Sequence, residues 1–168
     1  MSEDLRIRAA DLADLDELAE IHTRARASYY RGHVDERVLV DPEQAARRRD
    51  VIEGFLYSPD QALLCAEVDG RIVGFTAAGP SHDPDADPTS VGELYSLYVA
   101  PPSWRKGVGG ELLRAAVSRL RVSFGYLTLW VWEHNARARS FFSTRGWWLD
   151  EMARRADCPS FVRYQRHL

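Results

Sequence analysis

The sequence predicts one mixed α/β domain over residues 1–168, with a largely antiparallel sheet flanked by helices. Three observations lead to this prediction. Strand-like and helix-like segments alternate along the chain, a two-residue turn joins two strands, and a glycine-rich turn opens one helix. The expected order is strand, two helices, three strands, helix, strand, helix and two strands. A chain of 168 residues can bury a core without disulfides or metals.

The first segments are a strand and two helices. Residues 5–9 alternate apolar and charged side chains, as a half-buried strand does. Asp11 is placed to cap the first helix, and a second helix follows Asp41-Pro42. The run Arg47–Arg49 on this second helix is typical of a solvated helix face.

A hairpin and a loop come next. Residues 62–68 and 71–78 are strand-like, and Asp69-Gly70 between them is a strong signal for a two-residue hairpin turn. Residues 80–90 contain prolines and acidic side chains, and we expect a loop there. Residues 91–100 are strand-like again.

Two helix–strand alternations complete the chain. Residues 107–121 predict a helix whose apolar face is formed by Leu112, Leu113, Ala116, Val117 and Leu120. Asn135 can cap a further helix that Gly146 ends. The remaining strands are predicted at residues 126–132, 147–152 and 161–167.

Composition excludes several classes of protein. The net charge of −3 gives no basic field for nucleic acid or an anionic membrane. Cys65 and Cys158 lack metal-ligand spacing, and we expect free thiols in a reducing compartment. The acidic start, residues 1–4, is unlike a signal peptide, and no apolar run reaches the length of a membrane span. The sequence therefore predicts a cytoplasmic protein.

The turn Arg105-Lys106-Gly107-Val108-Gly109-Gly110 has the features of a phosphate site. Glycines let backbone amides approach a ligand closely, and a helix N-terminus favours an anion. A nucleotide P-loop would need Gly-Lys-Ser/Thr, where Gly109-Gly110-Glu111 stands, and the dinucleotide fingerprint would need a small residue in place of Leu112. The spacing alone also allows a tight turn without a ligand.

Two motifs of the sequence are specific. The first is Glu93-Leu94-Tyr95-Ser96-Leu97-Tyr98-Val99-Ala100-Pro101 followed by the glycine turn. The second is Asn135-Ala136-Arg137-Ala138-Arg139-Ser140-Phe141-Phe142, then Gly146-Trp147. Together they resemble the GNAT family of N-acetyltransferases, whose second motif is Asn-x-x-Ala-x-x-Phe-Tyr…Gly-Phe, and the resemblance covers nearly the whole chain. It implies a twisted sheet whose central strands splay apart at the cofactor, acetyl-coenzyme A.

The resemblance also implies which residues bind acetyl-coenzyme A. The strand end would bind the pantetheine arm through its backbone, the turn would bind the pyrophosphate, and Asn135 and Phe142 would lie near the pantetheine and the sulfur. The cofactor-binding residues expected on this basis are Leu97, Tyr98, Val99, Arg105, Lys106, Gly107, Val108, Gly109, Gly110, Asn135, Ala138 and Phe142. No metal ligand is expected.

Two positions depart from the family pattern. Trp104 stands where the family has Gln or Arg, which is tolerable if backbone amides do most of the binding. Phe142 stands where the family often has a tyrosine that protonates the leaving thiolate. That role is therefore vacant or filled by another group.

Acetyl transfer to an amine needs a base, because an amine with a pKa of ~10.4 is protonated at neutral pH. Glu93 lies where many family members present this base, and it shares a strand face with Tyr95 and Leu97 if no bulge intervenes. A surface carboxylate at a strand end is the alternative. Tyr95 and Tyr98 are the nearest phenols that could replace the missing acid, or they are core aromatics.

The acceptor is less clearly indicated. Tyr29 and Tyr30 fall between the first two helices, which line the acceptor side in the family, and we expect them to bind the substrate. The acidic loop, residues 82–87, could attract a cationic amine, but exposed loop acids are usually solvated. The predicted activity is acetylation of a primary amine on a small molecule or on a peptide or protein N-terminus.

Two alternatives remain open. One is a coenzyme A-binding sensor or partner domain without catalysis, which Phe142 favours and Glu93 disfavours. The other is an unrelated α/β nucleotide-binding domain. The predicted partners are an amine acceptor and, where self-association occurs, a second copy in a homodimer, with no nucleic acid and no membrane.

Overall fold

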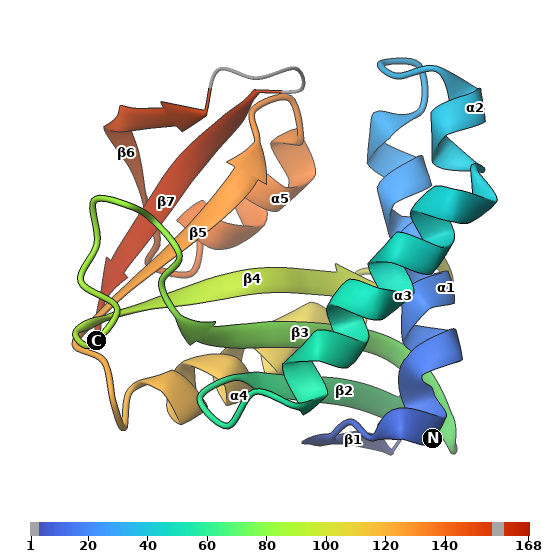
Figure 1. Cartoon of the computed structure of the whole chain (residues 1–168), viewed down its shortest axis with the longest axis horizontal. Coiled ribbons are helices and arrows are strands. Elements are labelled where there is room, and N and C mark those ends of the chain that lie inside the picture. Colours follow the sequence, from blue (N-terminus) through green and yellow to red (C-terminus); the bar gives the residue numbers. More distant parts are fainter. Residues whose placement is uncertain (1–3, 156–159) are drawn as a thin grey trace. The chain divides into compact units, whose positions relative to one another are not determined.

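The computed structural model describes residues 4–155 and 160–168 (Figure 1). Strands and α-helices follow in the predicted order, with one additional short helix, α2. The elements are β1 (Leu5–Ala9), η1 (Leu12–Asp14), α1 (Leu15–Tyr30), α2 (Glu36–Leu39), α3 (Pro42–Leu56), β2 (Ala62–Val68), β3 (Arg71–Pro80), β4 (Val91–Val99), η2 (Pro101–Ser103), α4 (Val108–Leu120), β5 (Tyr126–Trp132), α5 (Ala136–Ser143), β6 (Trp148–Arg155) and β7 (Phe161–His167).

In the described residues, seven strands form one sheet in the order β1-β2-β3-β4-β5-β7-β6. The predicted mixed, largely antiparallel sheet is confirmed, with β4 and β5 as a parallel pair. The contacts of the chain divide it into two compact units. We call residues 1–78 and 96–119 the N-terminal unit, and residues 79–95 and 120–168 the C-terminal unit. That residues 1–168 act as one domain remains a prediction.

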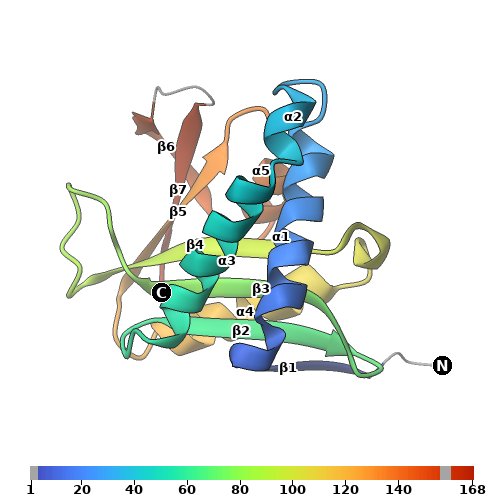
Figure 2. The same cartoon turned by 45° about the vertical axis from the view of Figure 1, so that its right-hand side comes forward.

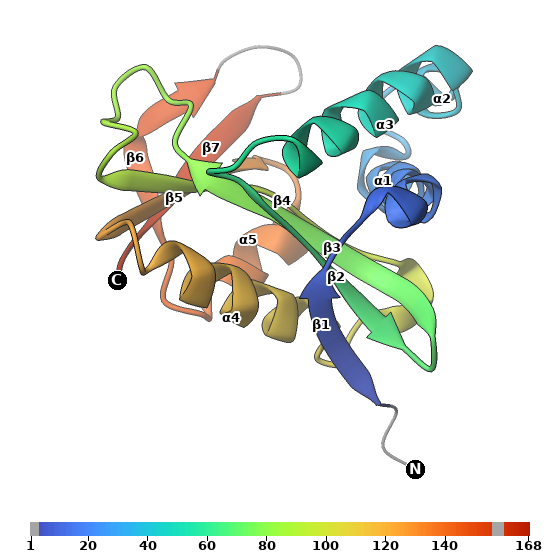
Figure 3. The same ribbon diagram turned by 60° about the horizontal axis from the view of Figure 1, so that its bottom comes forward.

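The N-terminal unit is a three-layered arrangement around β1, β2 and β3. These strands pair antiparallel, and α1 and α3 lie on one face of β2 and β3 (Figure 2). Figure 3 shows α4 on the opposite face. Asp69 (φ 50°) and Gly70 (φ 76°) join β2 to β3, which confirms the predicted hairpin turn. Positive φ at both central residues is what a type I′ turn requires.

The short helix η1, which leads directly into α1, begins with a capping box. Asp11 accepts a hydrogen bond from the backbone of Ala13, and the Asp14 carboxylate accepts one from the backbone of Asp11. Arg8 on β1 donates to Asp14 at 2.7 Å and holds the pKa of that carboxyl below its usual value. The predicted cap at Asp11 is therefore confirmed, and it also ties β1 to the first turn.

The N-terminal unit buries apolar side chains of α1 and α3 as well as those of α4. The predicted apolar face of α4 is buried throughout, because its residues recur at helical spacing. Val108 and Leu112 pack with Ala66, and Leu97 and Val99 from β4 contact the same cluster. The first turn of α4 and the end of β4 are thus parts of one packed cluster.

The basic run on α3 is not uniformly solvated, and the sequence interpretation was wrong for one residue. Arg47 and Arg49 are both solvent-accessible. Arg47 pairs with Glu43, and Arg49 pairs with Asp16 and Glu53. Arg48 is half-buried, and its Nε is inaccessible and has no hydrogen-bond partner. Three adjacent helix residues span about 200° of the helix circumference, so such a run can reach the edge of the buried stripe, and here Arg48 does so.

The C-terminal unit contains the first part of β4 with β5, β7 and β6. The parallel ladder runs from Val91–Tyr126 to Leu94–Leu129, although β4 and β5 both continue beyond it. An end to the ladder at this point is expected for strands that splay apart. β7 pairs antiparallel with both β5 and β6, and α5 lies behind β5 in Figure 1.

Cys65 is a buried free thiol, as expected, whereas Cys158 lies outside the described residues. Residues 1–3 of the acidic start also lie outside the described residues. None of the described helices is long and apolar enough to cross a bilayer.

Close packing at one glycine gives a test of the N-terminal unit. A Cβ at Gly74 on β3 would lie 2.8 Å from the Tyr98 carbonyl oxygen and 3.1 Å from Leu112 Cδ1. We expect Gly74→Ala to lower the free energy of unfolding by about 1–3 kcal/mol, because the backbone must shift. Urea unfolding measures this change.

Gly54→Ala is the matched control. Gly54 is an exposed residue of α3 with open space around it, so the same substitution should stabilise the protein by about 0.5–1 kcal/mol. Equal effects of the two substitutions would contradict the packing described for β3.

Candidate active site

The turn before α4 has the geometry of an anion site. Arg105 (φ 61°) and Gly107 (φ 87°) both adopt left-handed backbone conformations, and α4 begins at Val108. Arg105, Lys106 and Gly107 are exposed, and nothing lies within 4 Å of a Cβ built at Gly107. The turn is therefore open, carries two cationic residues, and leads into a helix N-terminus, where a phosphate is favoured.

The end of β4 lies directly beside this turn. Leu97 and Val99 contact the cluster that includes Val108, the first residue of α4. The Thr76 hydroxyl on β3 donates to the Ser96 carbonyl at 2.8 Å, and the amide of Ala100 donates to Val73. The structure thus brings together the expected pantetheine strand and the expected pyrophosphate turn.

Trp104, which stands where the family has Gln or Arg, makes a hydrogen bond to the end of β4. Its Nε1 donates to the Val99 carbonyl oxygen at 2.7 Å. The indole therefore links the turn to the end of β4. It occupies one lone pair of the carbonyl oxygen of Val99, a residue whose backbone was expected to bind pantetheine. A backbone carbonyl oxygen has two lone pairs, so this one can accept a second hydrogen bond.

The side chain of Tyr98 contacts α1. Its ring stacks on His22 with the centroids 4.4 Å apart, and it lies 5.6 Å from the ring of Phe75. A side-chain hydrogen bond with Tyr98 and above all burial raise the pKa of Tyr29, which is consequently neutral. Tyr30 is buried and packs on Tyr29 at 4.5 Å. Tyr98 and the two tyrosines expected to bind substrate thus form one aromatic cluster.

Glu93, in the C-terminal unit, is a buried carboxylate. Only 7% of the residue is exposed, and its Oε2 accepts a hydrogen bond from the backbone amide of His82 at 2.8 Å. Burial raises the pKa of Glu93, the His82 amide opposes this shift, and the negative charge of Asp83 reinforces it. Glu93 is thus not the surface carboxylate that the sequence left open, and its raised pKa is typical of a general base.

Tyr95 contacts the same loop residue as Glu93. Its ring stacks on His82 with centroids 4.7 Å apart, and its hydroxyl donates to the Pro80 carbonyl. Glu93 and Tyr95 therefore both contact His82, and the common strand face of Glu93, Tyr95 and Leu97 stays a prediction. The hydrogen bond gives the Tyr95 hydroxyl a structural role, and its catalytic role stays a prediction.

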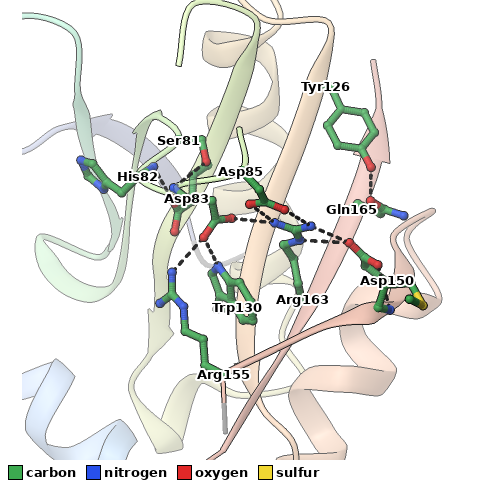
Figure 4. Close-up of polar contacts among 12 residues, drawn as sticks. Ser81, His82, Asp83, Asp85, Tyr126, Trp130, Asp150, Arg155, Arg163 and Gln165 are labelled. Carbon is green, nitrogen blue, oxygen red and sulfur yellow. Dashed lines mark hydrogen bonds and ion pairs between the residues drawn. The ribbon is translucent and has the colours of Figure 1, made fainter. Parts of the chain in front are cut away.

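The loop that contacts Glu93 is held by ion pairs (Figure 4). Asp83 is buried, with 1% of its side chain exposed, and accepts hydrogen bonds from Trp130 Nε1 at 2.8 Å and Arg155 at 2.9 Å. Arg163 approaches Asp83 to 3.4 Å and also binds Asp85 and Asp150. Asp83 and Arg163 thereby attach the loop to β5, β6 and β7.

The acidic loop was expected to be solvated, and for Asp83 that expectation was wrong. The acids neutralise arginines on β6 and β7, and burying a carboxylate is tolerable only with such partners. The pairs join residues 72 and 80 positions apart, so no local pattern reveals them. Alternation on β7, where Val162 and Tyr164 are buried, does indicate that Arg163 faces the other side of the sheet.

Asn135, Ala138 and Phe142 lie on or beside α5 in the C-terminal unit. The Asn135 side chain accepts a hydrogen bond from the Ala138 amide at 3.1 Å, which confirms the predicted cap. Phe142 is buried, with its ring centroid 5.1 Å from Phe141 and 5.9 Å from Trp147. The cap uses the side-chain oxygen of Asn135, and its role in binding the cofactor stays a prediction.

The structure thus assembles the expected site residues in two sets. The N-terminal unit holds the turn, the β4 end and the tyrosine cluster, and the C-terminal unit holds Glu93, Tyr95 and the α5 residues. Among the described residues, no group of three or more potential metal ligands is found. Sequence reasoning considered Asp83 only as one of the acids of the loop, and it missed Trp130, Arg155 and Arg163.

With this geometry described, comparison with known proteins identifies the class. The model of the acetyltransferase (GNAT) family matches residues 17–147, and the chain belongs to this family of acyltransferases. An uncharacterized N-acetyltransferase of Archaeoglobus fulgidus is 32% identical over 145 residues, which cover 84% of this chain and 91% of that protein. A probable N-acetyltransferase of Mycobacterium tuberculosis is 29% identical over 149 residues, or 87% and 81% of the two chains.

Solved structures agree on the fold. PaiA N-acetyltransferase from Thermoplasma acidophilum, solved with coenzyme A, has a TM-score of 0.79 at 20% identity and covers 98% of this chain and 99% of its own. YncA of Salmonella typhimurium, a putative acetyltransferase solved with acetyl-coenzyme A, has a TM-score of 0.69 at 20% identity, covering 98% and 94%. The predicted GNAT-like fold is confirmed.

The ion pairs of the loop give a prediction for stability. Asp83→Asn keeps an acceptor for Trp130 but leaves Arg155 and Arg163 without their buried carboxylate partner. We expect a loss of about 1.5–3 kcal/mol in the free energy of unfolding, because the charge-assisted hydrogen bonds to Arg155 and Arg163 are weakened, although Arg163 keeps Asp85 and Asp150 as partners. Urea unfolding measures the loss.

Asp87→Asn is the control in the same loop. Asp87 accepts hydrogen bonds from Thr89, and asparagine retains that acceptor, so stability should hardly change. A variant at Asp83 that is as stable as the one at Asp87 would show that the ion pairs do not hold the loop.

Proposed function

We propose that this protein transfers the acetyl group of acetyl-coenzyme A to a primary amine of a small molecule or of a peptide or protein N-terminus. The observation that carries the proposal is the packing of Leu97 and Val99 against Val108, the first residue of α4. A strand end and an anion-binding helix start, joined in one cluster, suit a ligand that has a peptide-like arm and a pyrophosphate. The proposal treats residues 1–168 as one catalytic domain.

The turn fits the pyrophosphate of acetyl-coenzyme A. Its left-handed residues turn the backbone so that successive amides can face one anion, and Arg105 and Lys106 add positive charge. The backbone of Leu97, Tyr98 and Val99 would bind the pantetheine as an added strand does. Gly109, Gly110, Asn135, Ala138 and Phe142 complete the proposed binding residues. When bound, the cofactor supplies an acetyl thioester.

Glu93 is proposed to accept the proton of the amine, directly or through a water molecule. Its Oε2 is engaged by the His82 amide, so Oε1 is the oxygen proposed for the incoming proton. Because burial raises the pKa of Glu93, its conjugate acid holds the proton more firmly than a solvated carboxyl would. The amine then attacks as a neutral nucleophile.

The thiolate leaving group needs less help. A thiol has a reference pKa of ~8.5, so its anion leaves more readily than an amine does. Phe142 has no proton to give. Tyr98 is the better of the two proposed acids, because the Tyr95 hydroxyl already donates to Pro80. Tyr29 and Tyr30 next to Tyr98 are proposed to contact the acceptor.

A coenzyme A-binding sensor domain without catalysis is the second candidate. The buried phenylalanine at position 142 favours it, because the position lacks the proton donor that the family often has. Release of thiol in the presence of an amine panel separates the two candidates. A sensor would bind acetyl-coenzyme A and release no thiol above the rate of hydrolysis.

The turn predicts a stability gain on binding. Acetyl-coenzyme A at 100 times its dissociation constant should stabilise the protein by about 2.7 kcal/mol. Gly109→Val should abolish this gain, because a branched side chain would occupy the proposed place of the pyrophosphate. A thermal shift assay with and without the cofactor measures both proteins, and an unchanged shift in the variant would falsify the site.

The base assignment predicts a pH profile. At saturating cofactor, kcat should rise with pH through one ionisation that lies above the ordinary glutamate range, since the raised pKa of Glu93 keeps it protonated to higher pH. Glu93→Gln should remove this limb and lower kcat by ~100-fold or more. Steady-state kinetics between pH 5 and about 9 measure the change.

Glu93→Gln should not destabilise the fold. A carboxyl whose pKa is raised by folding favours the native state at low pH, and this contribution is lost as pH rises from the unfolded pKa through the folded one. A neutral amide avoids that loss and keeps an acceptor for His82. If the variant binds cofactor and turns over as fast as the parent across the pH range, Glu93 is not the base.

A further inference from the structure

Two arginines on α1 and α3 differ from the other arginines of these helices. Their neighbours form ion pairs with carboxylates at the surface: Arg24 with Glu20, Arg47 with Glu43, and Arg49 with Asp16 and Glu53. Among the described residues, neither Arg26 nor Arg48 forms such an ion pair. Both are half-buried, and Arg26 lies over the Tyr30 ring at 4.8 Å.

Arg48 has the less favourable environment of the two arginines. Its Nε is buried and has no hydrogen-bond partner in the described structure. Burial lowers the pKa of Arg48, and the charge of Arg26 lowers it further. The charge of Asp41 acts in the opposite direction without forming an ion pair. A buried donor without an acceptor and a like-charge neighbour are both unfavourable.

His22 adds a second buried polar atom without a partner. Its Nδ1 is inaccessible and makes no hydrogen bond in the described residues. Burial first, and then the charges of Arg26 and Arg48, lower the pKa of His22 to about 3, so the imidazole is neutral at pH 7. A neutral imidazole can donate one hydrogen bond to an anion without adding charge repulsion.

These groups lie beside the proposed reaction strand. His22 stacks on Tyr98, the residue between Leu97 and Val99. α1 and α3 lie on the face of the sheet opposite α4, whose start holds the proposed pyrophosphate turn (Figure 3). The whole cluster belongs to the N-terminal unit. The turn belongs to the same unit, but it lies at the start of α4 on the opposite face of the sheet. The cluster is thus separate from the proposed pyrophosphate turn and lies on the side where the acceptor is expected.

We propose that Arg26, Arg48 and His22 bind an oxyanion on the acetyl acceptor, a carboxylate or a phosphorus oxyacid. This inference rests on the proposed function and narrows its substrate to amines that carry an anionic group. A guanidinium presents a planar set of donors that suits such oxyanions, and an anion would satisfy the Arg48 Nε and offset the repulsion between the arginines.

Other acceptor classes fit this cluster less well. A di- or polyamine would bring a second cation toward two guanidinium groups that already repel each other. A monoamine without an anion would leave the buried nitrogens of Arg48 and His22 unsatisfied. The charge and the missing hydrogen bonds thus both favour an anionic amine.

The test uses matched amines. Each pair consists of an amino acid or aminophosphonate and the same amine with hydrogen in place of the acid group, with different spacers between the amine and the acid. Thiol release from acetyl-coenzyme A gives kcat/KM. We expect the anionic member to be preferred by about 10- to 100-fold, mainly through KM, and Arg48→Gln to remove most of this preference.

Arg49→Gln is the control, because Arg49 is the next residue on α3 and pairs with surface carboxylates. It should leave the preference unchanged. Arg48→Gln removes an unsatisfied buried group, so its melting temperature should not fall. Arg26→Gln provides a second variant of the cluster and should reduce the preference in the same direction.

A binding measurement separates this inference from the proposed function. The N-acetyl derivatives of the anionic amines are titrated calorimetrically into the protein with coenzyme A present. Binding that Arg48→Gln weakens by 10-fold or more, with no amine turned over, would refute catalysis and support the oxyanion site. The inference is overturned if the parent prefers the amines without an acid group, if none of the acids binds, or if Arg48→Gln and Arg26→Gln keep the preference.

Discussion

The attachment of the loop at Asp83 is the interaction on which the candidate chemistry depends. Arg155, Arg163 and Trp130 hold this buried carboxylate against strands β5, β6 and β7. The adjacent residue, His82, then donates its amide to Glu93 at a fixed place. Glu93 is buried, and burial is the main cause of its raised pKa. The ion pairs of Asp83 with Arg155 and Arg163 thus fix the loop residue His82, whose amide donates to Glu93. The negative charge of Asp83 also raises the pKa of Glu93, although the two carboxylates share no hydrogen bond.

In the N-terminal unit, the end of β4 is held by side-chain packing on both of its faces. Leu97 and Val99 bury their side chains beside α4, whereas Tyr98 between them packs on His22 of α1. Both faces of the strand are therefore occupied, and the main chain is held by packing on either side. Trp104 fixes the turn to the same strand through the Val99 carbonyl, and the left-handed conformation of Arg105 is retained although its side chain has a Cβ. Strain of this kind is commonly kept where a ligand binds.

Sequence reasoning predicted the order of strands and helices, the hairpin turn, the caps at Asp11 and Asn135 and the buried face of α4, because each depends on residues close together in the chain. It could not predict the burial of Asp83, whose partners lie 72 and 80 residues away. It also placed Arg48 in solvent, since a run of three arginines does not reveal which one faces the sheet. The family motifs led to the proposed cofactor-binding residues, and the structure adds the hydrogen bonds and packing contacts that some of these residues make within the protein.

The central claim is that this member of the GNAT family transfers an acetyl group to an amine. The most direct measurement is a single turnover with one equivalent of acetyl-coenzyme A and a panel of amines, with acetylated amine and free thiol both quantified by mass spectrometry. The account predicts that one acetylated amine forms for each thiol released, with amines that carry an acid group reacting fastest. Binding of the cofactor with no acetylated amine formed, or thiol release without an acetylated product, would contradict it.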